Sequence, residues 1–127
     1  MLLTACATVS RNYSTGETII FDKITESVGM SNKTGFVNTG KFTCEHPGLY
    51  VAMFTMFEIT DNDLYFIYKN DDTLTFINSG KFQQETMHTV SGSAATYLKV
   101  KDTLSIRPND KISHLGSIYS CLSIVKV

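Results

Sequence analysis

The chain has 127 residues, of which 43% are hydrophobic and 18% are charged, and its formal net charge is -1 with a pI near 6.3. A chain of this length buries roughly two thirds of its unfolded surface, so we expect a single domain over residues 1–127. The near-neutral charge excludes a basic field for nucleic acid or for an anionic membrane. No apolar run approaches the roughly twenty residues of a membrane span, so we expect no transmembrane segment.

Short runs rich in β-branched and aromatic residues alternate with turn-forming residues along the chain, whereas helical periodicity is weak. Clusters such as Ser14-Thr15-Gly16 and His46-Pro47-Gly48 separate these runs. The pattern predicts an all-β fold. The predicted strands, in chain order, span residues 5–10, 17–22, 41–44, 49–57, 64–69, 73–77, 93–100, 103–107 and 117–127.

The predicted strand at 49–57 is apolar on both faces, since Thr55 is its only polar residue. Its alternate positions form two apolar sets: Tyr50, Ala52, Phe54 and Met56 on one face, and Leu49, Val51, Met53 and Phe57 on the other. A sandwich core covers one face of a sheet, so the second face must meet a covering loop or another subunit. We favour another subunit, because an apolar outer face is typical of an oligomer interface. The sequence does not show which set lies in the core.

Three cysteines, Cys6, Cys44 and Cys121, form no close pair and no metal-ligand spacing. Their odd number in a chain with a large core argues against a disulfide framework. We interpret all three as small buried apolar residues. One bridge with a free thiol remains the alternative.

The most specific stretch is TGKFTCEHPGLYVAMF at residues 39–54, where a Thr-Gly-x-Phe turn leads into Pro-Gly-x-Tyr. It is preceded by ETIIFDKITESVG at 17–29 and followed by LYFIYKND at 64–71, SGSAATYLKVKDTLSIRP at 91–108 and SIYSCLSIVKV at 117–127. In this order the segments resemble the globular head domain of complement C1q and its relatives, which are structural cousins of the tumour necrosis factor ligands. Cys121, Asp71 and Lys101 stand where the family pattern has glycine, which affects the expected turn geometry.

The resemblance implies a jelly-roll β-sandwich of two antiparallel sheets that assembles as a homotrimer. It also implies a stand-alone, secreted head domain, because no Gly-X-Y collagen tract is present in this sequence. The stretch MLLTAC is too short for a signal peptide, so a secreted product would have lost its signal.

No catalytic motif is present. The histidines His46, His88 and His114 are scattered, and the sequence lacks the common hydrolase, P-loop and dinucleotide-binding patterns. We therefore expect no enzyme activity and no cofactor.

Calcium deserves separate consideration, because some relatives in the family that the sequence resembles bind it before the strand that starts at Ser91. The corresponding loop here contains one carboxylate, Glu85, which serves a hard cation poorly. Asp61 and Asp63 are weak candidate ligands should their loop meet another acidic one. We expect no metal site, with calcium as the less favoured alternative.

The resemblance implies a soluble, multivalent pattern-recognition protein of innate immunity that binds microbial or self surface glycans: polysaccharide, lipopolysaccharide or sialylated glycan. Polar and aromatic loop residues suit such ligands, and a trimer converts weak contacts into avidity. A cytokine-like or adhesive ligand for a protein receptor is the alternative, and a structural trimerisation module is a third. The candidate ligand contacts are Tyr68, Asn70 and Asp72 from one turn, with Arg107, Asn109, Lys111 and His114 from the segment before the last strand.

Overall fold

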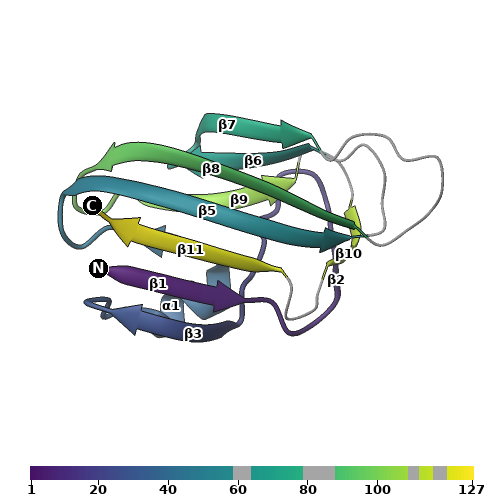
Figure 1. The fold of residues 1–127 in the computed structure, drawn as a ribbon, viewed down its shortest axis with the longest axis horizontal. Coiled ribbons are helices and arrows are strands. Elements are labelled where there is room, and N and C mark those ends of the chain that lie inside the picture. Colours follow the sequence, from purple (N-terminus) through teal and green to yellow (C-terminus); the bar gives the residue numbers. More distant parts are fainter. Residues whose placement is uncertain (59–63, 79–87, 109–111, 116–119) are drawn as a thin grey trace.

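The computed structural model describes the chain except for residues 59–63, 79–87, 109–111 and 116–119 (Figure 1). The described residues are mostly strand, with one short helix. The elements are β1 (Leu2–Cys6), β2 (Arg11–Tyr13), β3 (Lys23–Val28), α1 (Lys33–Thr39), β4 (Phe42–Thr43), β5 (Gly48–Glu58), β6 (Leu64–Lys69), β7 (Asp72–Asn78), β8 (His88–Leu98), β9 (Thr103–Pro108), β10 (Ile112–Leu115) and β11 (Cys121–Lys126).

Within the described residues, the strands form two main antiparallel sheets, which confirms the predicted jelly-roll sandwich. One sheet has the order β3-β1-β11-β5-β8, the other has the order β4-β9-β6-β7, and β10 and β2 form a separate ribbon. The first and last strands, β1 and β11, pair in the interior of the five-stranded sheet, so the two chain ends lie beside each other (Figure 1). The described part of the chain has no helix long and apolar enough to cross a membrane.

The core settles which face of β5 is internal. Tyr50, Ala52, Phe54 and Met56 are all buried, and each is at most 2% exposed. They therefore belong to the sandwich core and not to a subunit interface. The alternate set points outward, with Leu49 and Met53 each 46% exposed, so the outer face of this sheet remains apolar.

The segment from residue 14 to residue 40 departs most from the sequence prediction. Residues 17–22 do not form a strand, although Ile19 and Phe21 are fully buried, and β3 follows them instead. Helix α1 was not predicted, because its sequence KTGFVNT contains β-branched residues and a glycine that disfavour helix. Its stability comes from its ends and its core contact: Asn32 Oδ1 accepts a hydrogen bond from the Gly35 amide, and the Phe36 ring is buried.

The cysteine interpretation is wrong for two of the three residues. Cys6 and Cys121 are paired across β1 and β11, with a Cα–Cα distance of 4.0 Å, and they form a disulfide bond. Cys44 is buried and is not part of this bond. The alternative of one bridge with a free thiol is therefore correct. The pairing depends on bringing the two ends of the chain together, which spacing along the sequence does not reveal.

Candidate ligand-binding site

Strand alternation on β6 and β9 builds a surface on the outer face of the four-stranded sheet. Tyr65 and Ile67 point into the core and are fully buried, so Phe66 lies on the opposite, outer face. Arg107 of β9 is the direct partner of Phe66 across the sheet and shares this face. The face therefore combines aromatic rings with a guanidinium group.

Arg107 is held by contacts from three sides. Its guanidinium carbon lies 4.2 Å from the centroid of the Tyr68 ring, which is a cation–π contact. Its Nε donates to Ser105 Oγ at 3.2 Å, and its Nη2 donates to the Asn70 carbonyl oxygen at 3.2 Å. The Asp71 carboxylate lies 3.7 Å from Nη2. We call the group of Tyr68, Asn70, Asp71 and Arg107 the Arg107–Tyr68 platform.

Asn70 fixes the β6–β7 turn against the β8–β9 turn. Its backbone adopts φ 55°, a left-handed conformation that asparagine tolerates better than most residues. Its side-chain Oδ1 accepts from the Thr103 amide at 3.0 Å, and its Nδ2 donates to Asp102 Oδ1 at 3.1 Å. Hydrogen bonds from the Lys99 amide and then from Asn70 lower the pKa of Asp102, which keeps its carboxylate ionised. Asn70 thus positions the carbonyl that holds Arg107.

Aromatic side chains extend the platform towards the sheet edge. Phe66 meets Tyr68 edge to face, with ring centroids 6.0 Å apart, and it meets Phe76 of β7 at 6.3 Å. Phe76 is 64% exposed, and β7 is the edge strand of its sheet. The result is a continuous surface that is aromatic at the edge and cationic at Arg107.

The structure brings together three of the seven predicted ligand contacts: Tyr68, Asn70 and Arg107. Asp72 is exposed at the start of β7, directly after the platform turn. Asn109 and Lys111 lie outside the described residues, as do Asp61 and Asp63. His114 belongs to β10, but its side chain also lies outside the described part.

Sequence reasoning missed four residues of this site: Phe66, Asp71, Phe76 and the buried Ser105. Asp71 was noted as a replacement for a turn glycine and, with Asp72, as a carboxylate that could join Asp61 and Asp63 in a metal site, but not as a ligand contact. Ser105 and Phe76 became visible only through strand pairing, because Ser105 is opposite Tyr68 and Phe76 is opposite Phe66. Alternation within each strand gives the face on which a residue lies, but not its neighbours across the sheet.

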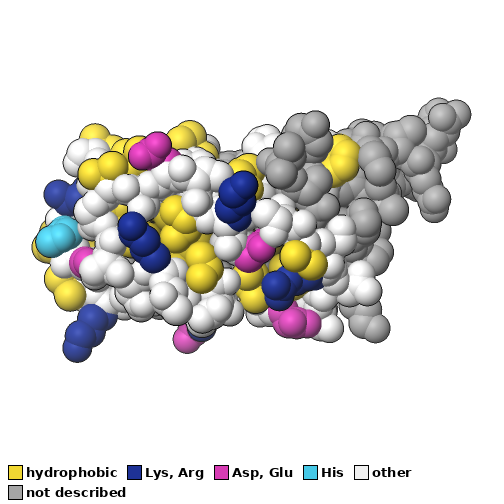
Figure 2. Space-filling view, turned by 90° about the horizontal axis from the view of Figure 1, so that it is seen from below, with side chains coloured by type: hydrophobic (Ala, Val, Ile, Leu, Met, Phe, Trp, Pro, Cys, Tyr) yellow, Lys and Arg dark blue, Asp and Glu magenta, His cyan; other side chains and the backbone are white. Residues whose placement is uncertain are grey.

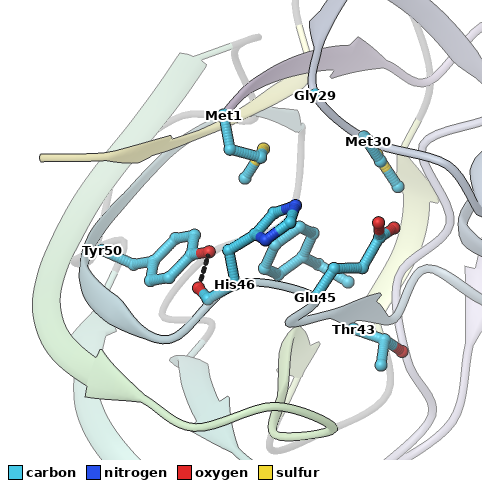
Figure 3. A pocket seen from close by; sticks show the side chains of 8 residues that line it. Met1, Gly29, Met30, Thr43, Glu45, His46 and Tyr50 are labelled. Carbon is cyan, nitrogen blue, oxygen red and sulfur yellow. Dashed lines mark hydrogen bonds between the residues drawn. The ribbon is translucent and has the colours of Figure 1, made fainter.

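A crevice beside the β4–β5 connection is structural (Figure 3). Met1, Met30 and His46 surround it, and it is too narrow to hold a water molecule. The Glu45 carboxylate beside it accepts hydrogen bonds from the amides of Ser31 and Asn32, and the bond from Ser31 lowers its pKa. These groups tie the turn before α1 to the β4–β5 connection.

A shallow depression of about 390 Å³ lies on the outer face of β5 and β8. Met53, Thr55, Ser91 and Ser93 line it, and Thr55 and Ser91 share a hydrogen bond of 3.1 Å between their hydroxyl groups. The depression has no charged lining residue. This surface suits a flat apolar partner better than an ionic ligand.

The charged side chains that Figure 2 shows among the described residues do not form a cluster of one sign. On the face shown in Figure 2, lysine and arginine side chains are interspersed with aspartate and glutamate. Among the described residues, no three His, Cys, Asp or Glu side chains lie close enough together to hold a metal ion.

The fold and sequence place the chain among known proteins. Its structure is similar to the globular domain of zebrafish complement 1qA, with a TM-score of 0.81 and 15% identity over 99% of this chain and 96% of that one. It is also similar to Eiger TNF from S. frugiperda (TM-score 0.79, 15% identity, 100% and 92% covered) and to murine APRIL (TM-score 0.73, 10% identity, 99% and 98% covered). These similarities show the fold. The sequence model of the C1q domain matches residues 4–123, and the chain therefore belongs to the C1q domain family.

Proposed function

We propose that this protein is a secreted, non-enzymatic recognition protein that binds glycans of microbial or self surfaces as a homotrimer. The observation that carries the proposal is the Arg107–Tyr68 platform. Sugars present hydroxyl groups around an apolar ring face, so the half-buried Tyr68 ring and a fixed hydrogen-bond donor suit them. The platform lies on the outer face of the four-stranded sheet, away from the five-stranded sheet.

The homotrimer is supported by the outer face of the five-stranded sheet. Leu49 and Met53 on β5 are each 46% exposed, and Tyr97 on β8 is 57% exposed. A contiguous apolar face of this kind typically marks an interface. Three platforms on one rigid assembly would convert weak sugar contacts into useful avidity.

Light scattering tests the assembly. The wild-type protein should scatter as a trimer at micromolar concentration, and Met53→Lys should scatter as a monomer, because the new ammonium group cannot be buried in an apolar interface. Val100→Lys is the matched control: Val100 is 53% exposed but lies in the β8–β9 turn, and this variant should remain trimeric. A monomeric wild type would overturn the trimer.

A glycan and bacterial-polysaccharide array tests the ligand, run once with calcium and once with chelator. The wild-type protein should bind a selective subset, and Arg107→Gln and Tyr68→Ala should each lose at least about tenfold in signal. Met53→Lys should bind the array more weakly because it loses avidity, while its circular dichroism spectrum should remain that of the folded protein. A blank array from folded, trimeric protein would reject glycan recognition.

A ligand for a protein receptor is the second candidate, and the exposed Phe76 beside Phe66 favours it. Aromatic side chains with this exposure are common anchors of protein interfaces. Free monosaccharide at millimolar concentration should compete with a glycan but not with a receptor. Phe76→Ala should weaken receptor binding more than Arg107→Gln does. For a sugar ligand, Arg107→Gln should weaken binding more than Phe76→Ala does. A structural trimerisation module would show neither activity.

A further inference from the structure

Within the described part of the chain, contacts fix the position of Arg107 but only weakly balance its positive charge. Its side chain is only 14% exposed, since Tyr68 covers one side of the guanidinium and Ser105 and Asn70 accept from it. These contacts orient the group before any ligand arrives, which lowers the entropy cost of binding. Both hydrogen-bond acceptors are neutral, so they do not balance the positive charge.

The acidic partner of Arg107 among the described residues is Asp71, and it is weakly held. The Nη2–Oδ1 distance of 3.7 Å is longer than a hydrogen bond, and the Asp71 side chain is 97% exposed. Ion pairs with such exposure contribute little to stability. The neighbouring Asp102 is engaged elsewhere, by the Lys99 amide and by Asn70 Nδ2. Asp71 can therefore leave Arg107 at small cost.

We propose that the platform binds the carboxylate of an acidic sugar on Arg107, and that Asp71 occupies this anion position in the free protein as a built-in competitor. The inference rests on the proposed function and narrows its ligand class. A guanidinium has N–H donors and no acceptor, so it gains more from a carboxylate than from a neutral hydroxyl. Asp71 then sets the selectivity, because its charge repels acidic ligands that cannot displace it.

The test compares three variants with two matched sugars. The probes are methyl glucuronide and methyl glucoside, which differ in having a carboxylate or a neutral hydroxymethyl group. Calorimetry should show that Asp71→Asn binds the glucuronide about fivefold more tightly than wild type and leaves glucoside binding unchanged. Asp72→Asn removes the same charge from the next residue and should change binding less than twofold. Arg107→Lys should lose at least about tenfold for the glucuronide, because lysine cannot stack on Tyr68 in the same planar manner.

A second measurement needs no sugar. The Arg107 Nε–Hε signal in an NMR titration with sodium acetate should shift, and Asp71→Asn should reach half saturation at a several-fold lower acetate concentration than wild type or Asp72→Asn. The inference is overturned if Asp71→Asn and Asp72→Asn behave alike, or if acetate leaves the Arg107 signal unchanged. Acetate binding with a blank glycan array would support the anion site while rejecting the proposed function. Glycan binding that Asp71→Asn leaves unchanged would support the proposed function and reject the role of Asp71 as a competitor.

Discussion

The Tyr50 hydroxyl donates a hydrogen bond of 2.6 Å to the carbonyl oxygen of His46, and so spans the Pro47-Gly48 turn that leads into β5 (Figure 3). Tyr50 is fully buried, so this bond gives its hydroxyl proton an acceptor inside the core, while the Cys44 thiol donates to the Tyr50 hydroxyl oxygen at 3.7 Å. Tyr50→Phe should lower the free energy of unfolding by about 1 kcal/mol. Urea denaturation measures the change. The exposed Tyr97→Phe is the control and should change stability by less than about 0.5 kcal/mol.

The same tyrosine should make stability sensitive to alkaline pH. Burial, and next the hydrogen bond with Cys44, raise the pKa of Tyr50 to about 12. Unfolded tyrosine ionises near 10, so the unfolded chain releases its proton first as the pH rises. The contribution of Tyr50 is therefore fully present below about pH 10 and is lost between about 10 and 12. Unfolding midpoints across this range should fall less steeply in Tyr50→Phe, although Tyr13, whose pKa burial also raises, keeps part of the decline.

Two of the predicted strands agree closely with the structure. The predicted range 64–69 coincides with β6, and the predicted strand at 49–57 lies within β5. Residues 17–22 were assigned to a strand because Ile19, Ile20 and Phe21 form an apolar run. The Ile19 amide does donate to the Ile106 carbonyl oxygen of β9 at 2.9 Å, but the segment forms no strand. An apolar run that is buried in an irregular segment therefore has the same sequence pattern as a buried strand.

The disulfide should contribute strongly to stability. Cys6 and Cys121 are 115 residues apart, so the bond closes nearly the whole chain into a loop. Loop-closure entropy predicts that Cys6→Ser with Cys121→Ser lowers the free energy of unfolding by about 5 kcal/mol. Reductant should destabilise the wild type by a similar amount and leave the double variant unchanged. An effect of reductant on the double variant would assign the sensitivity to another cause.

The turn between β8 and β9 contains backbone strain at Lys101 that a substitution should relieve. Lys101 adopts φ 76°, a left-handed conformation that costs a residue with a Cβ about 1 kcal/mol or more. The family that the sequence resembles has glycine here, and the backbone keeps the glycine conformation despite the substitution. Lys101→Gly should therefore raise the free energy of unfolding by about 0.5–1 kcal/mol in urea denaturation. Lys99→Gly removes the same charge two residues away and should not stabilise.

The candidate site was predictable in its composition and not in its geometry. Tyr68, Asn70 and Arg107 were selected as polar or aromatic residues near turns, and the structure joins them. The role of Asn70 as a support for the turn depends on the Thr103 and Asp102 contacts, which are 33 and 32 residues away. Such contacts follow from strand order in the sheet, which alternation within a single strand does not specify.

Alanine substitutions at two glycines distinguish the cost of backbone strain from the cost of a steric clash. Gly40, the C-cap of α1, has φ 74°, and Gly16 has φ 81°, so alanine is strained at both. A Cβ at Gly40 would collide with the Ile19 carbonyl oxygen, whereas a Cβ at Gly16 would meet open space. Gly16→Ala should cost about 1 kcal/mol and Gly40→Ala at least about 3 kcal/mol in urea denaturation, because only the second forces the backbone at Ile19 to move. Equal losses of unfolding free energy would show that the backbone at Ile19 moves away from residue 40 without cost. The left-handed backbone alone would then set the loss.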